Sequence, residues 1–161
     1  MSTMVQNYVG GGWRGASGSE TLAVTNPASG REIGRVPLST GTDVDEAVQA
    51  AKAAYPEWRS TPSPDRARVL FRLNSLLDEH KEDLARLLTT EHGKVIAETR
   101  GEIQRGIENI EHACGIPSMM MGDTVEQIAQ GIDSASWRQP MGVFGIITPY
   151  NFPVMIPLWF W

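Results

Sequence analysis

The sequence predicts an α/β protein in which small β-hairpins come first, helices follow, and a parallel sheet begins near the carboxyl end. Glycine- and proline-rich turns separate short β-forming segments within residues 1–40. Apolar residues then recur at helical spacing over residues 44–114. A continuous apolar run over residues 143–148 is of the kind that is buried on both faces of a parallel sheet.

Composition and charge limit the functional classes. The 161 residues are 41% hydrophobic and 20% charged, which is typical of one globular domain, here residues 1–161. The formal charge of −5 comes from 19 acidic and 14 basic residues spread along the chain. The basic residues form no stripe that could follow a phosphate backbone, so nucleic acid is not expected as a partner. No apolar stretch reaches the ~18 residues of a membrane span, and no secretory signal is evident, so we expect a cytoplasmic protein with no membrane partner.

Two hairpins are expected at the start. A β-forming segment at Asn7–Val9 precedes the glycines Gly10–Gly12, and two further segments, Thr21–Thr25 and Glu32–Val36, flank a turn at residues 26–30. A phosphate-binding loop is the alternative for the glycine run. It is disfavoured because no GxxxxGK[ST] pattern follows and the glycines do not open a helix.

Three helices are predicted next. The first carries an apolar stripe over Val44–Trp58, and Asp43 with Glu46 is expected to form its capping box. The second begins at Ser63–Pro64, carries a leucine stripe that we expect in the core, and ends at Gly93; the third covers about 95–114. After these helices, residues 124–137 lose the helical period and are interpreted as strands.

The third helix has two distinct faces. Its isoleucines and Cys114 share a narrow arc, so the thiol is interpreted as a small buried hydrophobe rather than a nucleophile. Arg105 lies on the opposite, polar face, where it faces either bulk water or a polar cavity. The three histidines have no cysteine or histidine at metal-ligand spacing, so no metal site is predicted.

The run at 143–148 ends at Pro149-Tyr150-Asn151-Phe152-Pro153, whose prolines stop a strand and can open a helix. Ligands of open α/β sheets bind at the carboxyl ends of strands, which places residues 148–151 where a cofactor or substrate binds. From position alone, Asn151 is interpreted as an ordinary helix cap or loop amide, with a binding role as the alternative.

The segment "GVFGIITPYNFP" resembles the signature of the aldehyde dehydrogenase superfamily. The resemblance extends over the whole chain through "NPASGREIGRVP", "AAYPEWRSTP" and "RARVLFRLNSLLDEHKEDLARLLTTEHGK". Within the superfamily, "QRGIEN" and "PSMMMGD" are most similar to methylmalonate-semialdehyde dehydrogenases. The resemblance implies the N-terminal part of the aldehyde dehydrogenase fold, with the start of its Rossmann-like parallel sheet.

This resemblance also implies a chemistry. Members oxidise methylmalonate or malonate semialdehyde with NAD and coenzyme A, giving propionyl- or acetyl-CoA and carbon dioxide, and they are homo-oligomers, tetramers when complete. Asn151 matches the asparagine that donates to the oxyanion. Thr148, Pro149 and Tyr150 match positions that line the NAD site, and Arg105 is the candidate for the substrate carboxylate.

The resemblance places the nucleophilic cysteine, an adenosine-binding lysine and most of the dinucleotide-binding and catalytic domains beyond Trp161. The final "PLWFW" differs from the usual "PLWMFP", and its apolar end indicates a truncated chain, expected to be inactive alone. Two alternatives stay open: another aldehyde dehydrogenase, such as one for succinate semialdehyde, or a non-catalytic binding module.

Overall fold

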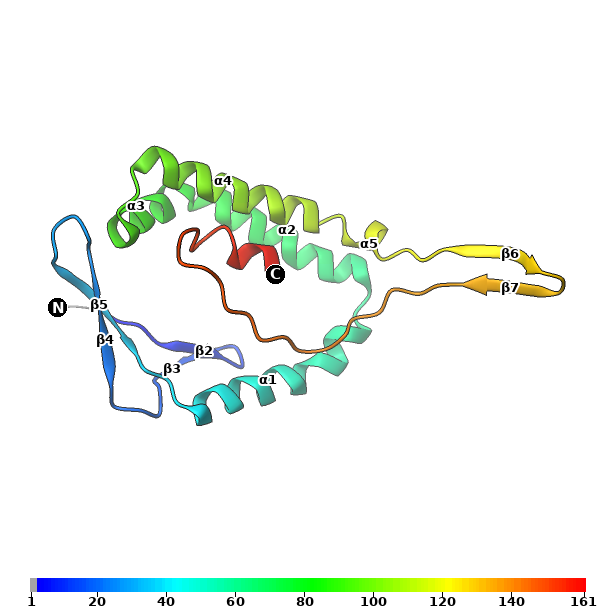
Figure 1. The fold of residues 1–161 in the computed structure, drawn as a ribbon, viewed down its shortest axis with the longest axis horizontal. Coiled ribbons are helices and arrows are strands. Elements are labelled where there is room, and N and C mark those ends of the chain that lie inside the picture. Colours follow the sequence, from blue (N-terminus) through cyan, green and yellow to red (C-terminus); the bar gives the residue numbers. More distant parts are fainter. Residues whose placement is uncertain (1–2) are drawn as a thin grey trace.

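The computed structural model describes residues 3–161 as an elongated body with a hairpin projecting from one end (Figure 1). A layer of α2, α3 and α4 lies on one side, and α1 lies with the amino-terminal strands on the other (Figure 1). The elements are β1 (Thr3–Met4), β2 (Asn7–Val9), β3 (Gly12–Arg14), β4 (Thr21–Thr25), β5 (Glu32–Pro37), α1 (Gly41–Ser60), α2 (Ser63–Glu79), α3 (Lys81–His92), α4 (Ile96–Ala113), α5 (Ile116–Met119), β6 (Thr124–Ala129), β7 (Ile132–Ala135) and the 3₁₀ helix η1 (Pro157–Phe160).

Both amino-terminal hairpins are confirmed. Strands β2 and β3 pair antiparallel around Gly10 and Gly11, whose φ angles of 61° and 82° lie in the left-handed region that glycine enters without strain. Strands β4 and β5 also pair antiparallel, and the Asn26 side chain stabilises their turn by accepting a 2.9 Å hydrogen bond from the Ala28 N–H. A parallel pairing of β1 with β5 was not anticipated from the sequence.

The start of α1 differs from the prediction. The N-cap is Thr40, and its N–H donates to the Asp43 carboxylate at 2.7 Å, so the box joins Thr40 to Asp43 rather than Asp43 to Glu46. The helix begins earlier than predicted, which makes Asp43 the third helical residue and not the cap. Hydrogen bonds from the backbone of Thr40 and Ser17 lower the pKa of this carboxyl.

The second predicted helix is divided into α2 and α3 at His80. The backbone of His80 has φ −98° and ψ 10°, outside the helical region, which bends the chain while its carbonyl still accepts from the Leu84 N–H at 3.0 Å. The third predicted helix is confirmed as α4, which contacts both α2 and α3.

The core lies between these three helices. Ala85, Ile103 and Ile107 are its buried centre, with Val154 from the far end of the chain packed against it. The leucine stripe of α2 and α3 is core only in part, because residues such as Leu76 and Leu87 are more than half exposed. Cys114 is buried as predicted, and burial raises the pKa of its thiol. None of the helices within residues 3–161 combines the length and apolar composition needed to cross a membrane.

The strands predicted over 124–137 are confirmed as the β6–β7 hairpin, whereas the strand predicted over 143–148 is not formed. That segment crosses the molecule as an irregular chain (Figure 1), and Ile147 is fully exposed. A strand forms only where a neighbour satisfies its backbone N–H and C=O groups, and no strand in residues 3–161 pairs with it. Just before this segment, a side chain of α1 holds the main chain, since Tyr55 Oη donates to the Pro140 carbonyl at 2.9 Å.

Candidate functional site

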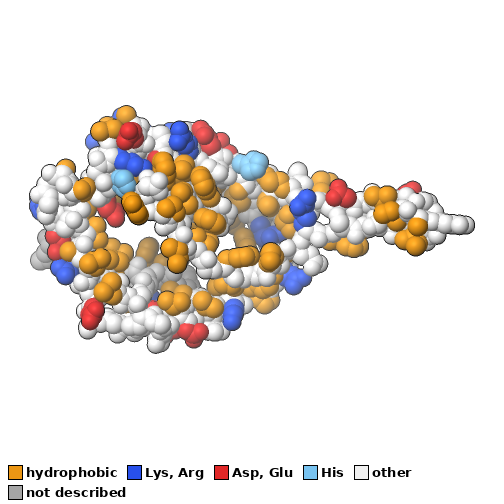
Figure 2. Space-filling model, in the orientation of Figure 1, with side chains coloured by type: hydrophobic (Ala, Val, Ile, Leu, Met, Phe, Trp, Pro, Cys, Tyr) orange, Lys and Arg blue, Asp and Glu red, His pale blue; other side chains and the backbone are white. Residues whose placement is uncertain are grey.

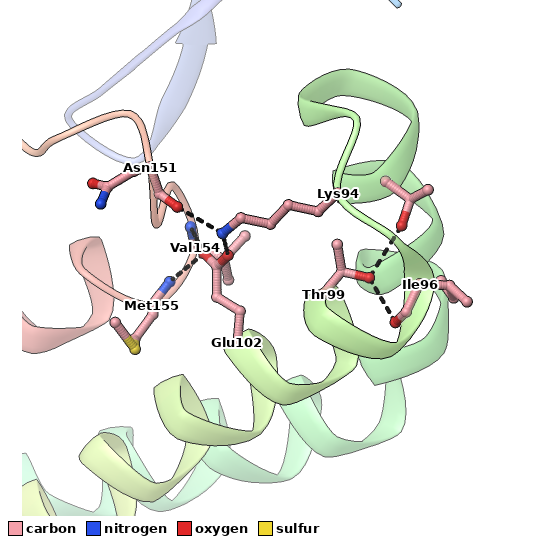
Figure 3. Close-up of polar contacts among 8 residues, drawn as sticks. Lys94, Ile96, Thr99, Glu102, Asn151, Val154 and Met155 are labelled. Carbon is pink, nitrogen blue, oxygen red and sulfur yellow. Dashed lines mark hydrogen bonds and ion pairs between the residues drawn. The ribbon is translucent and has the colours of Figure 1, made fainter. Parts of the chain in front are cut away.

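Asn151 lies on a tight turn after the irregular segment. The turn continues into η1 through the Ile156 N–H, which donates to the Phe152 carbonyl at 3.2 Å. Prolines at 149, 153 and 157 favour this compact path because each fixes its φ angle near that of a turn. The Asn151 side chain is exposed, and it forms no hydrogen bond with any residue from 3 to 161. Figure 3 shows its amide pointing away from Lys94.

An ion pair between the half-buried Lys94 and the buried Glu102 fixes the backbone of this turn (Figure 3). Lys94 Nζ lies 2.6 Å from Glu102 Oε2 and donates a second hydrogen bond of 2.6 Å to the main-chain carbonyl of Asn151. Glu102 Oε1 accepts from the N–H groups of Val154 and Met155 at 2.9 and 3.2 Å. Three charge-assisted hydrogen bonds therefore join the pair to the turn, and the fourth contact joins Lys94 to Glu102 of α4.

The environment keeps Glu102 ionised. Glu102 is only 3% exposed, and burial alone raises the pKa of a carboxyl. Hydrogen bonds from Lys94 and from the N–H groups of Val154 and Met155 outweigh burial, so the pKa of Glu102 is lowered from its ordinary value of 4.5. The Lys94 ammonium is also held 4.3 Å above the centre of the Phe152 ring, a cation–π contact.

The side chain of Arg105 lines a cavity beside the Lys94–Glu102 ion pair. The cavity, of about 340 Å³, is bounded by α4, Lys94 and the Phe152 ring. Arg105 is exposed, and within residues 3–161 no carboxylate lies within ion-pair distance of its guanidinium. Arg100 differs, because it makes two hydrogen bonds of 2.8 Å to the Glu82 carboxylate. The structure therefore distinguishes a guanidinium with no ion-pair partner in residues 3–161 from one that is already paired.

The candidate NAD-site residues lie apart from Arg105. Thr148 is half-buried and lines a second cavity, of about 420 Å³, with η1 and Trp161, while Tyr150 is 88% exposed. Pro149 is exposed between them. No three His, Cys, Asp or Glu side chains in the described part of the chain cluster as metal ligands do.

Lys94 and Glu102 were not recognised from the sequence. The isoleucines define the predicted buried face of the helix that contains Glu102. A glutamate beside that face is typical of a solvent-exposed residue. At 100° per residue, Gly106 and Thr99 lie between the isoleucine arc and Glu102, and the structure buries both. Lys94 gave no signal, because it precedes α4 and its hydrogen bond to the turn reaches the Asn151 carbonyl, 57 positions away.

Comparison with known proteins gives the family. Residues 13–161 match the aldehyde dehydrogenase family. Over 158 residues the chain is 52% identical to malonate-semialdehyde dehydrogenase 1 of Geobacillus kaustophilus, covering 98% of this chain and 32% of that protein. It is also 52% identical over 156 residues to malonate-semialdehyde dehydrogenase of Bacillus pumilus, with 97% and 32% covered.

Solved structures agree. The crystal structure of methylmalonate-semialdehyde dehydrogenase from Oceanimonas doudoroffii aligns with a TM-score of 0.92 at 43% identity, covering 99% of this chain and 32% of that one. A Sinorhizobium meliloti protein assigned to the methylmalonate-semialdehyde dehydrogenases and crystallised with NAD aligns with a TM-score of 0.94 at 38% identity, with 99% and 32% covered. The chain spans about a third of the length of these relatives. By sequence over nearly its whole length, and by fold, the chain belongs to the aldehyde dehydrogenase family.

Proposed function

We propose that this chain is part of an NAD-dependent, CoA-acylating dehydrogenase of malonate or methylmalonate semialdehyde. The observation that carries the proposal is that the Arg105 guanidinium has no ion-pair partner within residues 3–161. It lines a cavity that Phe152, from the Asn151 turn, also lines. A guanidinium fork is the natural receptor for a carboxylate, which both semialdehydes carry at the end opposite the aldehyde. The names of the 52%-identical relatives support the same substrate class.

In this proposal Asn151 stabilises the oxyanion. Attack on an aldehyde places negative charge on its oxygen, and a preorganised amide N–H lowers the free energy of that state. The exposed amide of Asn151, with no partner in residues 3–161, is free to donate in this way. Thr148, Pro149 and Tyr150 form part of the wall beside the nicotinamide. NAD, when bound, supplies the hydride acceptor, and coenzyme A takes the acyl group.

The nucleophile is not expected from these 161 residues. Their single cysteine, Cys114, is buried, and the pKa of its thiol is raised, so little thiolate exists at neutral pH. We therefore propose that the isolated chain is inactive. By its family resemblance, we also propose that the complete enzyme is a cytoplasmic homo-oligomer, a tetramer, that acts on small semialdehydes.

The test is a hybrid enzyme in which residues 1–161 replace the matching third of the Geobacillus kaustophilus relative. NADH formation is followed with malonate, methylmalonate and succinate semialdehyde, each with and without coenzyme A. We expect turnover of the first two that depends on coenzyme A. Preference for succinate semialdehyde without coenzyme A would favour the other dehydrogenase class. NADH production by the isolated chain would contradict its proposed inactivity and exclude a non-catalytic module.

A further inference from the structure

No hydrogen bond within residues 3–161 holds the side-chain amide of Asn151, so its position depends on the backbone that carries it. Its side chain forms no hydrogen bond with residues 3–161, whereas its own carbonyl accepts a hydrogen bond of 2.6 Å from Lys94. A catalytic donor works only when it is held near its productive geometry. What holds the Asn151 peptide therefore fixes the backbone position from which the amide extends.

The backbone is held from both sides of the turn. Lys94 fixes the carbonyl of Asn151, and Glu102 fixes the N–H groups of Val154 and Met155. Because Lys94 and Glu102 also pair with each other at 2.6 Å, the two attachments form one rigid unit (Figure 3). Its base is α4, whose neighbouring residue Ile103 is completely buried in the core.

A contribution to stability alone does not explain why an ion pair occupies this position. Removing two charges from water is costly, and a buried ion pair adds little net stability compared with apolar residues of similar size. The side chain of Glu102 is 1% exposed and that of Lys94 is 15% exposed. What this pair provides that an apolar contact does not is directional hydrogen bonding to the main chain of residues 151–155.

We propose that Lys94 and Glu102 are positioning residues that orient the Asn151 amide toward the reacting aldehyde oxygen by clamping the main chain of the turn. This inference rests on the proposed function, because it assigns a purpose to the orientation of Asn151. Neither side chain needs to touch the substrate for this role. Loss of either clamp residue lets the turn move, and misplacement by about 1 Å lowers turnover by roughly 100-fold.

A double-mutant cycle in the hybrid enzyme tests the proposal. Lys94→Met should lower kcat by about 10- to 100-fold and leave KM for NAD nearly unchanged. On an Asn151→Ala background the same substitution should cause almost no further loss of kcat, because the donor it positions is already gone. Arg100→Met is the matched control, since it breaks an exposed ion pair to Glu82 with no contact to the turn. It should leave kcat unchanged.

The outcomes separate this inference from the proposed function. Independent, multiplied losses for Lys94→Met and Asn151→Ala would overturn the positioning role, as would normal kcat in Lys94→Met. If Asn151→Ala alone has normal turnover, the oxyanion assignment fails and the positioning role fails with it. Glu102→Gln gives a second reading: it keeps an oxygen acceptor for the Val154 and Met155 N–H groups, so it should lower kcat less than Glu102→Ala. Equal losses would contradict the clamp.

Discussion

Gly106 of α4 lies so close to Leu158 of η1 that a side chain at Gly106 would collide with it. A Cβ at Gly106 would lie 2.7 Å from Leu158 Cδ1 and 3.6 Å from the Met155 Cα. The absence of a side chain lets η1, and with it the Asn151 turn, rest directly on the helix. Close packing and the ion pair of Lys94 with Glu102 therefore act on the same segment.

Comparison of two glycine substitutions in α4 measures this packing. Gly101→Ala should raise the free energy of unfolding by up to about 1 kcal/mol, because alanine favours the helix and its Cβ meets no atom within 4 Å. Gly106→Ala should be less stable than Gly101→Ala by about 1 kcal/mol, since Leu158 must shift to admit the methyl group. Urea unfolding of both variants gives the difference. Equal gains would show that η1 does not pack against Gly106 in solution.

Local patterns made most of the elements predictable. The hairpins and α4 follow from turn residues and helical periodicity within short stretches, and both are formed. The apolar run at 143–148 is different, because a buried parallel strand depends on partner strands that its own residues do not specify. With no pairing strand in residues 3–161, the run stays irregular.

The candidate site residues Asn151 and Arg105 come from single motifs, and their roles stay predictions. Position after an apolar run, or opposite the isoleucines, left the roles of Asn151 and Arg105 open, and the resemblance to aldehyde dehydrogenases supplied the roles proposed for them. Neither argument reaches Lys94, whose contact with Asn151 joins residues 57 positions apart. Contacts of this kind depend on how α4 and the final turn pack together, which periodicity within each segment does not determine.

The lowered pKa of Glu102 predicts a specific loss of stability in acid. A carboxyl whose pKa is lower in the folded than in the unfolded state stabilises the fold fully above the unfolded value, near 4.5. That contribution is lost as the pH falls through the folded value. The stability difference between the parent chain and Glu102→Gln should therefore be largest near neutral pH and should shrink below about pH 4.5.

Urea unfolding at a series of pH values measures this difference. Comparison of two variants at each pH cancels the contributions of other carboxyls with lowered pKa values, such as Asp43 and Glu82. A stability difference that stays constant between pH 7 and pH 3 would mean that Glu102 is not ionised against Lys94 in the folded chain.

Substitution of Arg105 should change substrate preference. In the hybrid enzyme, Arg105→Leu removes the proposed receptor for the carboxylate, and loss of a charge-assisted contact costs about 1.5–3 kcal/mol, roughly a 10- to 150-fold loss in kcat/KM. We expect a raised KM for malonate and methylmalonate semialdehyde and little change for an uncharged aldehyde. Arg100→Leu is the control on the same helix, because its guanidinium is already paired with Glu82. Equal effects of Arg105→Leu on charged and uncharged aldehydes would count against the carboxylate role.

Substitution of Asn151 should slow the chemical step and spare cofactor binding. Asn151→Ala in the hybrid enzyme removes one oxyanion donor, which typically lowers kcat by about 100- to 1,000-fold. NAD affinity, measured by equilibrium titration without substrate, should stay close to that of the parent, because the amide is proposed to face the aldehyde oxygen rather than the cofactor. Asn151→Asp is the informative companion: it keeps the size of the side chain but replaces the donor with a negative charge, which repels the oxyanion. It should therefore be at least as slow as Asn151→Ala, and faster turnover would show that the side chain does not donate to the oxyanion.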